Sequence, residues 1–155
     1  MRDGRRAMQE ERNLGERREP AGGAAEPMSP QDERTWSIVA HLSVLAGLVG
    51  LVPLGALIVW LLYKDRSPRV RFHALQAFWY QLAWIVIFTV YVLVTVVLSI
   101  VTLGIAAIVL VPLAFLLALV PLAHGCYAAY KVNGGVDYRY PFIADRIDGG
   151  ARRTL

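Results

Sequence analysis

The sequence predicts an all-α membrane protein with four transmembrane or membrane-embedded helices, of which the first two are short and the last two long. Residues 35–63 contain no Asp, Glu, Lys or Arg, and neither do residues 72–130. A helix that spans a bilayer needs about 20 apolar residues, so the second stretch is long enough for two. Hydrophobic residues make up 56% of the 155 residues, more than an ordinary soluble domain carries.

Two tails flank the predicted membrane domain. Residues 1–31 mix Arg and Glu with Gly, Ala and Pro and contain no apolar run, so we expect a disordered charged tail without a signal-peptide core. The helical domain is predicted over residues 32–147, with a flexible C-terminal tail over 148–155. Its helices are expected at residues 34–49, 53–64, 69–101 and 105–132. Asp32 is the expected N-cap of the first helix, because a carboxylate suits the positive end of a helix.

Two alternatives remain for the way residues 36–63 lie in the membrane. Trp36–Val49 would be about 21 Å long as a helix and Leu54–Tyr63 about 15 Å, so neither alone spans a hydrocarbon core of about 30 Å. As one helix kinked at Pro53, the stretch would cross the membrane once and place the N-terminal tail outside. As two short helices joined near Gly50, it would double back and keep the tail inside.

The second half of the chain predicts two full crossings. The basic loop Lys64–Arg71 faces the cytoplasm by the positive-inside rule. Leu82–Val101 is rich in β-branched residues, yet a lone strand is not viable in lipid, so a helix is expected. A reversal at residues 102–104 returns the chain through Ile105–Tyr130. The C-terminus therefore lies in the cytoplasm.

Two stripes of residues at helical spacing are candidates for helix packing. The first contains the small residues Ala40, Ser43, Gly47 and Gly50, and the second contains Tyr91, Thr95, Ser99 and Thr102. Small and weakly polar side chains allow close approach and hydrogen bonds between helices in lipid. We expect these stripes to contact a second copy of the chain or a larger membrane complex.

Five polar side chains are candidates for a cavity in the cytoplasmic leaflet. They are His41, His73, Gln76, Gln81 and His124. Polar residues inside a membrane favour function, but each of these could instead reach interfacial water or bond across helices. No two histidines have a ligand spacing on one helix, so no metal site is predicted, and no catalytic or cofactor-binding residue is expected. Tyr138, Arg139 and Tyr140 are expected to anchor the chain among the lipid headgroups.

Three segments resemble, in order, one group of small bacterial membrane proteins. They read DERTWSIVAHLSVLAGL (32–48), LIVWLLYKDRSPRVRFHALQA (57–77) and KVNGGVDYRYPF (131–142). Over residues 32–147 the chain is similar to the bacterial proteins grouped with the twenty-kilodalton component of the chloroplast inner-envelope import translocon. The resemblance implies four helices with both ends in the cytoplasm, and the plant relative is linked to preprotein translocation. Arg69 and Arg71 stand where many members of that group have an acidic residue before the histidine.

The predicted function is that of a non-enzymatic, multi-pass protein of the inner (cytoplasmic) membrane. It would act as an interaction or accessory subunit, surrounded by membrane lipids. The alternative is a small transport or protein-translocation component that uses the polar cavity. The basic residues lie beside the apolar stretches, where they meet lipid headgroups, so no nucleic-acid partner is expected.

Overall fold

The computed structural model describes residues 26–152. The expected disordered tail lies mostly outside the described residues, as do residues 153–155 at the C-terminus. Every regular element in the described part is helical. The elements are α2 (Pro30–Leu42), the 3-10 helix η1 (Ser43–Val49), α3 (Leu54–Tyr63), α4 (Pro68–Val101), α5 (Ile105–Asn133) and α6 (Ile143–Arg152).

The first helix begins earlier than the sequence predicted. Ser29 is the N-cap of α2 and its hydroxyl accepts the Asp32 N–H at 3.1 Å, with Pro30 in the first turn. Asp32 was the expected cap, but it lies inside the first turn, where its carboxylate still complements the helix dipole. Pro30 fits there because the first turn of a helix has no use for its missing N–H.

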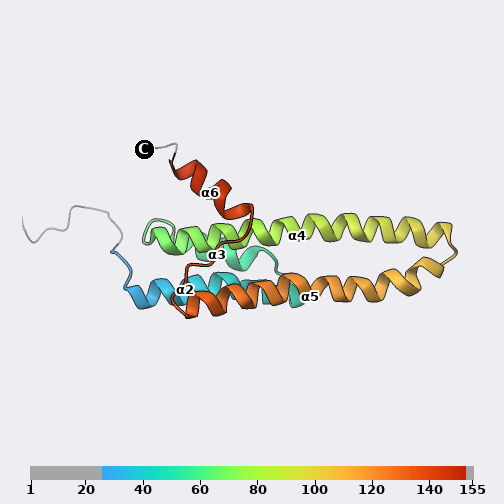
Figure 1. Cartoon of the computed structure of the whole chain (residues 1–155), viewed down its shortest axis with the longest axis horizontal. Helices are drawn as coiled ribbons and strands as arrows, with labels where there is room; N and C mark the ends of the chain where they lie inside the picture. Colours follow the sequence, from blue (N-terminus) through green and yellow to red (C-terminus); the bar gives the residue numbers. More distant parts are fainter. Residues whose placement is uncertain (1–25, 153–155) are drawn as a thin grey trace, which may run out of the picture.

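α2, η1 and α3 form a doubled-back pair at one end of the molecule (Figure 1). The rings of Trp36 and Tyr63, at the two ends of the pair, lie 4.5 Å apart between centroids. The α-helix gives way to a 3-10 helix at Ser43, which ends at Gly50 with a φ of 76°. Glycine suits this left-handed turn because it has no Cβ to clash. At the crossing, a Cβ on Gly55 would lie 2.6 Å from the Cβ of Ser43, so the two segments approach closely.

α4 and α5 are long and apolar enough to cross a membrane. They run side by side and extend well beyond α2 and α3 (Figure 1). We call residues 85–101 and 105–120 the apolar arm. Most of its apolar side chains are exposed, and Leu103, in the reversal that joins its two halves, is 94% exposed. Such a surface would be unfavourable in water and is stable in lipid.

Residues 26–84 and 121–152 form what we call the polar end, which contains α2, η1, α3, α6 and the remaining parts of α4 and α5. All Asp, Glu, Lys and Arg side chains of the described residues belong to it, since residues 72–130 contain none. α6 follows the extended segment 134–142, which we call the strap. A flexible tail was expected from residue 148, but α6 continues to Arg152. Its apolar residues recur at helical spacing, so it has a face that packs on α4.

Candidate functional site

One face of α4 binds the strap along its length. Arg69, His73, Gln76 and Tyr80 are spaced 4, 3 and 4 residues apart, so their side chains leave the helix on the same side. The cap of α4 fixes the start of this face, since the Ser67 hydroxyl accepts the Val70 N–H at 3.1 Å. The strap runs along α4 from Asp137 to Tyr140. Arg69 and His73 contact Asp137, and the next two residues of this face, Gln76 and Tyr80, contact the strap farther along.

Gln76 satisfies the backbone of the strap. Its Nε2 donates to the Tyr138 carbonyl at 2.7 Å, and its Oε1 accepts the Tyr140 N–H at 3.2 Å. Gln76 has no exposed surface. An extended backbone without a neighbouring strand needs such partners, because unpaired N–H and C=O groups are costly away from water. The side chain therefore fixes the strap against the bundle.

A chain of hydrogen bonds connects the strap to both buried histidines. His41 Nε2 lies 3.1 Å from His73 Nδ1, His73 Nε2 lies 3.2 Å from Asp137 Oδ1, and His41 Nδ1 lies 3.3 Å from the Tyr140 hydroxyl. A carboxylate only accepts, so His73 carries its proton on Nε2 and accepts on Nδ1. His41 then donates from Nε2 and accepts the Tyr140 hydroxyl proton on Nδ1. Gln76 Nε2 also lies 3.1 Å from His73 Nδ1, so the one lone pair of that nitrogen is shared by two N–H donors, and Gln76 joins the two histidines in one bonded group.

Asp137 is the only charged member of this chain. Arg69 Nη2 lies 2.7 Å from its Oδ1, and the aspartate side chain is 56% exposed. Partial burial raises the pKa of the Asp137 carboxyl, but the hydrogen bonds from His73 and Arg69 outweigh it and hold that pKa below its ordinary value of 3.8. The sequence suggested no carboxylate beside His73, because Arg69 and Arg71 precede it on the helix. The strap supplies one from 64 residues away.

His124 belongs to a second branch. Its Nδ1 lies 2.9 Å from the Tyr80 hydroxyl, and its Nε2 bonds to the Tyr138 hydroxyl. Tyr80 also stacks on Tyr140, with ring centroids 4.2 Å apart and planes 7° from parallel. This stack joins the His124 branch to the His41 branch through ring contact.

The tyrosines of the strap anchor it to protein. Tyr138 and Tyr140 were expected among lipid headgroups, but Tyr140 is 2% exposed and its ring lies inside the bundle. Burial raises the pKa of its phenol, which therefore stays protonated and able to donate to His41. Only Arg139 faces outward, where it pairs with Asp145 and Asp148 on α6 at 3.1 and 2.6 Å. The reason for the difference is that His41 and His124 offer the hydroxyls better partners than water at the membrane surface.

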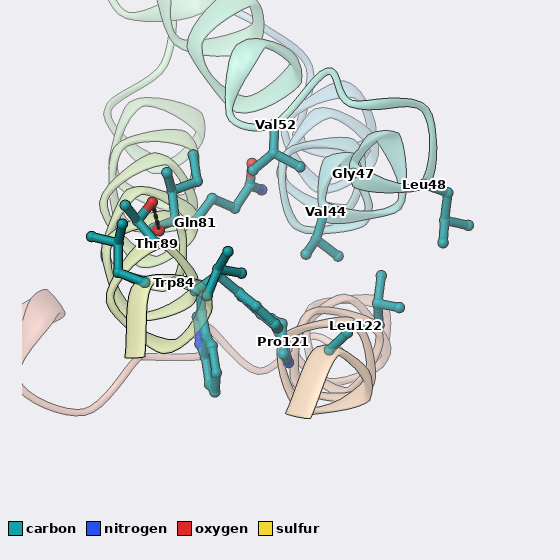
Figure 2. A pocket seen from close by; sticks show the side chains of 14 residues that line it. Val44, Gly47, Leu48, Val52, Gln81, Trp84, Thr89, Pro121 and Leu122 are labelled. Carbon is teal, nitrogen blue, oxygen red and sulfur yellow. Dashed lines mark hydrogen bonds between the residues drawn. The ribbon is translucent and has the colours of Figure 1, made fainter. Parts of the chain in front are cut away.

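Gln81 lies apart from these branches, beside an apolar groove of about 520 Å³ between η1, α4 and α5. Figure 2 shows its amide beside Val52, above Trp84 and Pro121. Its Nε2 donates to Ser43 Oγ at 2.9 Å, whereas its Oε1 is buried without a partner among the described residues. The five predicted polar residues therefore divide into three sets. His41, His73 and Gln76 form one bonded group, His124 is connected to that group through the tyrosines, and Gln81 lies apart at the groove. The residues of the bonded group have no exposed surface and fill the space in which a cavity was expected.

The two predicted packing stripes contact other parts of the same chain. Ala40 has no exposed surface, and Ser43 touches Gly55. The Tyr91 hydroxyl donates to the Leu110 carbonyl of α5 at 2.7 Å. Thr95 and Ser99 have buried hydroxyl oxygens with no partner among residues 26–152, and Thr102 caps the start of α5 by accepting the Ala106 N–H at 2.9 Å. Gly47 and Gly50 lie at the exposed reversal. We had expected a partner to cover these two stripes, and contacts within the chain occupy part of each.

In the described residues, no group of three or more His, Cys, Asp or Glu side chains is arranged to hold a metal ion. The geometry is that of a hydrogen-bonded strap at the base of a long, apolar helical arm. The magnetosome magnetite crystal formation protein family (MamF/MmsF) matches residues 32–147, which include the arm, the strap and both histidine branches. The chain belongs to this family. It is a family of small bacterial membrane proteins and not a known enzyme family. No curated protein and no solved structure matches the chain.

Membership in the MamF/MmsF family corrects the resemblance to the chloroplast import component, which was wrong. Those three segments cover α2 with η1, the basic loop with the helix ends beside it, and the exit of α5 into the strap. Any small helical membrane protein with its charges at one end needs such features. Such features indicate a helical membrane architecture, but they do not distinguish one family of small membrane proteins from another.

Sequence reasoning missed three members of the site. Arg69 and Tyr80 could have been found, because they continue the spacing of His73 and Gln76 on a helix that is otherwise mostly apolar. Asp137 carried no such signal, since its partners are distant in sequence and its role depends on the path of the strap.

Proposed function

We propose that this chain takes part in magnetosome crystal formation as a non-enzymatic accessory subunit of the membrane. The apolar arm would hold it in the bilayer, and the polar end would present the strap and α6 at one surface as a fixed binding platform. The observation that supports this role is the bonding of the strap. The polar groups of His41, His73 and Gln76 are bonded to one another and to strap residues, which suits a rigid platform better than a site for passing ligands.

We further propose that both ends of the chain lie in the cytoplasm, with the arm crossing the membrane twice and α2 and α3 dipping in from the same side. Two features support this arrangement. The basic loop Lys64–Arg71 favours the cytoplasmic side, and the contact of Trp36 with Tyr63 brings the start of α2 close to that loop.

Cysteine labelling tests this topology. With Cys126→Ser as background, single substitutions Ser29→Cys, Asp65→Cys and Leu103→Cys would be exposed to a membrane-impermeant maleimide. In intact cells, only Leu103→Cys should be labelled. In inside-out vesicles, Ser29→Cys and Asp65→Cys should be labelled instead. Labelling of Ser29→Cys in intact cells would contradict the doubled-back arrangement.

Release of the strap tests the accessory role. Gln76→Leu should free the strap and leave the apolar arm in the membrane. In a cell that forms magnetite and lacks its own copy of the chain, this variant should restore crystals no better than an empty vector, and partners bound by the wild-type chain in detergent extracts should be lost. Normal crystals with a demonstrably released strap would overturn the proposal.

A second candidate role is that of a small transport component. It is favoured by the unbroken hydrogen-bond chain from exposed Asp137 through His73 to buried His41, since such chains can pass protons. Substituting His41 and His124 with leucine separates the two roles. Unchanged assembly with lost flux in reconstituted vesicles supports transport, whereas lost assembly without any flux in the wild type supports the accessory role.

A further inference from the structure

A cleft separates α6 from the first turns of α4. It encloses about 920 Å³. Its walls are apolar and consist of Phe72, Leu75, Trp79 and Ala83 on α4 with Ile143 and Ile147 on α6. Arg71, Arg146 and Asp148 add charge to the lining. Figure 1 shows α6 at an angle to α4, with the two helices diverging toward the end of α6.

The charged side chains of the lining that have no ion-pair partner among the described residues are positive. Arg139 Nη1 lies 2.6 Å from the carboxylate of Asp148, so the negative charge in the lining has its own partner. Arg71 and Arg146 are exposed, and no ion pair or side-chain hydrogen bond joins either of them to another residue of the described part. Two such guanidinium groups suit a phosphate, which they can bind through paired hydrogen bonds.

The apolar wall of the cleft continues into the membrane. Phe72, Leu75, Trp79 and Ala83 are spaced 3, 4 and 4 residues apart, and the same stripe continues at Val86, which is 57% exposed. A molecule bound by this surface therefore meets charge at one end and an uninterrupted apolar strip at the other.

The position of the arginines agrees with the depth of lipid headgroups. The uncharged part of α4, from Phe72 to Val101, is about 45 Å long at 1.5 Å per residue. A bilayer with its headgroup regions is about 40–45 Å thick. Arg71, directly before this part, thus lies where phosphates lie if the arm spans the bilayer, as proposed above.

We infer that the cleft binds one anionic phospholipid of the surrounding membrane. Arg71 and Arg146 hold the phosphate, and an acyl chain lies along Leu75 and Trp79 toward Val86. The arrangement of the lining, with arginines at one end and an apolar strip at the other, identifies the occupant. A free anion would leave the apolar walls uncovered, and a peptide would have no need of a strip that runs on into the hydrocarbon.

Native mass spectrometry of the full chain, purified in mild detergent, tests this inference. The wild type, incubated with equal amounts of phosphatidylglycerol and phosphatidylcholine, should retain one phosphatidylglycerol at least tenfold more often than phosphatidylcholine. Arg71→Gln with Arg146→Gln should reduce that retention by about fivefold for each arginine. Both side chains are exposed, so the variant should keep the circular dichroism spectrum of the wild type.

Two further variants separate the cleft from general surface charge. Lys64→Gln with Arg66→Gln removes the same charge from the neighbouring basic loop and should change retention by less than twofold. Ala83→Trp fills the inner part of the cleft without changing charge and should abolish retention. Equal losses from the two double variants, or full retention by Ala83→Trp, would overturn the inference.

Competition distinguishes the source of the phosphate. Millimolar inorganic phosphate should not displace the retained phosphatidylglycerol, and displacement would mean that the cleft binds only an anion. The inference rests on the proposed membrane placement, and the two can fail separately. Maleimide labelling that contradicts the placement of Leu103 refutes the placement itself, whereas expected labelling without lipid retention refutes the lipid site alone.

Discussion

The polar end and the apolar arm share α4 and α5 but differ in which side chains these two helices bury and expose. In the polar end, α4 buries His73 and Gln76 completely, whereas in the arm Val97 is 59% exposed. In lipid, where we propose that the arm lies, exposed apolar groups carry no cost, so burying them would add little stability. The helices of the arm would then associate through packing and a few hydrogen bonds. Unpaired polar groups are costly in the same surroundings. The polar end combines a small apolar core, which includes Ala40, Val59 and Val70, with hydrogen bonds that satisfy its buried polar groups.

The largest effect that this comparison predicts is at Gln76. Gln76→Leu leaves the Tyr138 carbonyl and the Tyr140 N–H without partners, which should lower the free energy of unfolding by about 3 kcal/mol. Gln81→Leu is the matched control on the same helix. It removes one bond to Ser43 and also an unpaired oxygen, so its cost should be 1 kcal/mol or less, on the order of one net hydrogen bond. Unfolding in mixed detergent and dodecyl sulfate micelles measures both, and equal costs would contradict this view of the strap.

A smaller effect is expected where α5 meets α2. A Cβ at Gly125 would lie 2.5 Å from Val44 Cγ1 and 3.2 Å from the His41 carbonyl oxygen. Gly125→Leu should therefore overpack this contact and cost about 2 kcal/mol. Ala123→Leu, on the exposed side of the same helix, should change stability by less than about 0.5 kcal/mol. The same unfolding experiment measures this pair, and a tolerated Gly125→Leu would show that the helices can move apart.

The sequence predicts the arm better than the polar end. Length and absence of charge determine the two long helices, because lipid allows few other structures. The start of the first helix is predicted less well. Asp32 and Ser29 are both good caps, and Pro30 decides between them through the first-turn preference of proline. The preference of Pro30 for the first turn can be seen in the sequence, but it is a weaker indication of the helix start than the carboxylates of Asp32 and Glu33.

The polar site shows a different limit of sequence reasoning. His41, His73 and Gln76 are prominent because the stretches around them are apolar, so they can be selected from the sequence. Their partners cannot be selected in the same way, since the strap could lie on the membrane surface or between the helices. Tyr140 illustrates this, because an aromatic residue beside an arginine is typical of a headgroup anchor, and only the path of the strap places it against His41.

Acid should weaken the polar end and leave the arm unchanged. The pKa of Asp137 is lower in the folded chain than its ordinary value of 3.8, so its bonds to Arg69 and His73 contribute stability above pH 3.8 that is lost as the pH falls through the lowered value. For a half-exposed pair the contribution should be about 1 kcal/mol or less. Protonation of the neutral buried histidines also weakens the polar end in acid, so the contribution of Asp137 is the difference in unfolding free energy between the wild type and Asp137→Asn. This difference should shrink as the pH falls below 3.8. A difference that stays constant well below pH 3.8 would contradict this assignment to Asp137.

The smallest predicted effect belongs to the arm. Tyr91→Phe removes the hydroxyl that donates to the Leu110 carbonyl at 2.7 Å. A hydrogen bond between helices in a membrane contributes about 0.6 kcal/mol on average, and the Leu110 carbonyl lies within α5, where it can keep its helical partner. Tyr140→Phe is the same chemical change in the polar end, but it leaves the buried Nδ1 of His41 unpaired and should cost about 1–3 kcal/mol. Measured side by side in mixed micelles, the two variants compare the regions directly. A cost for Tyr91→Phe as large as that for Tyr140→Phe would mean that the arm, too, depends on satisfied polar groups.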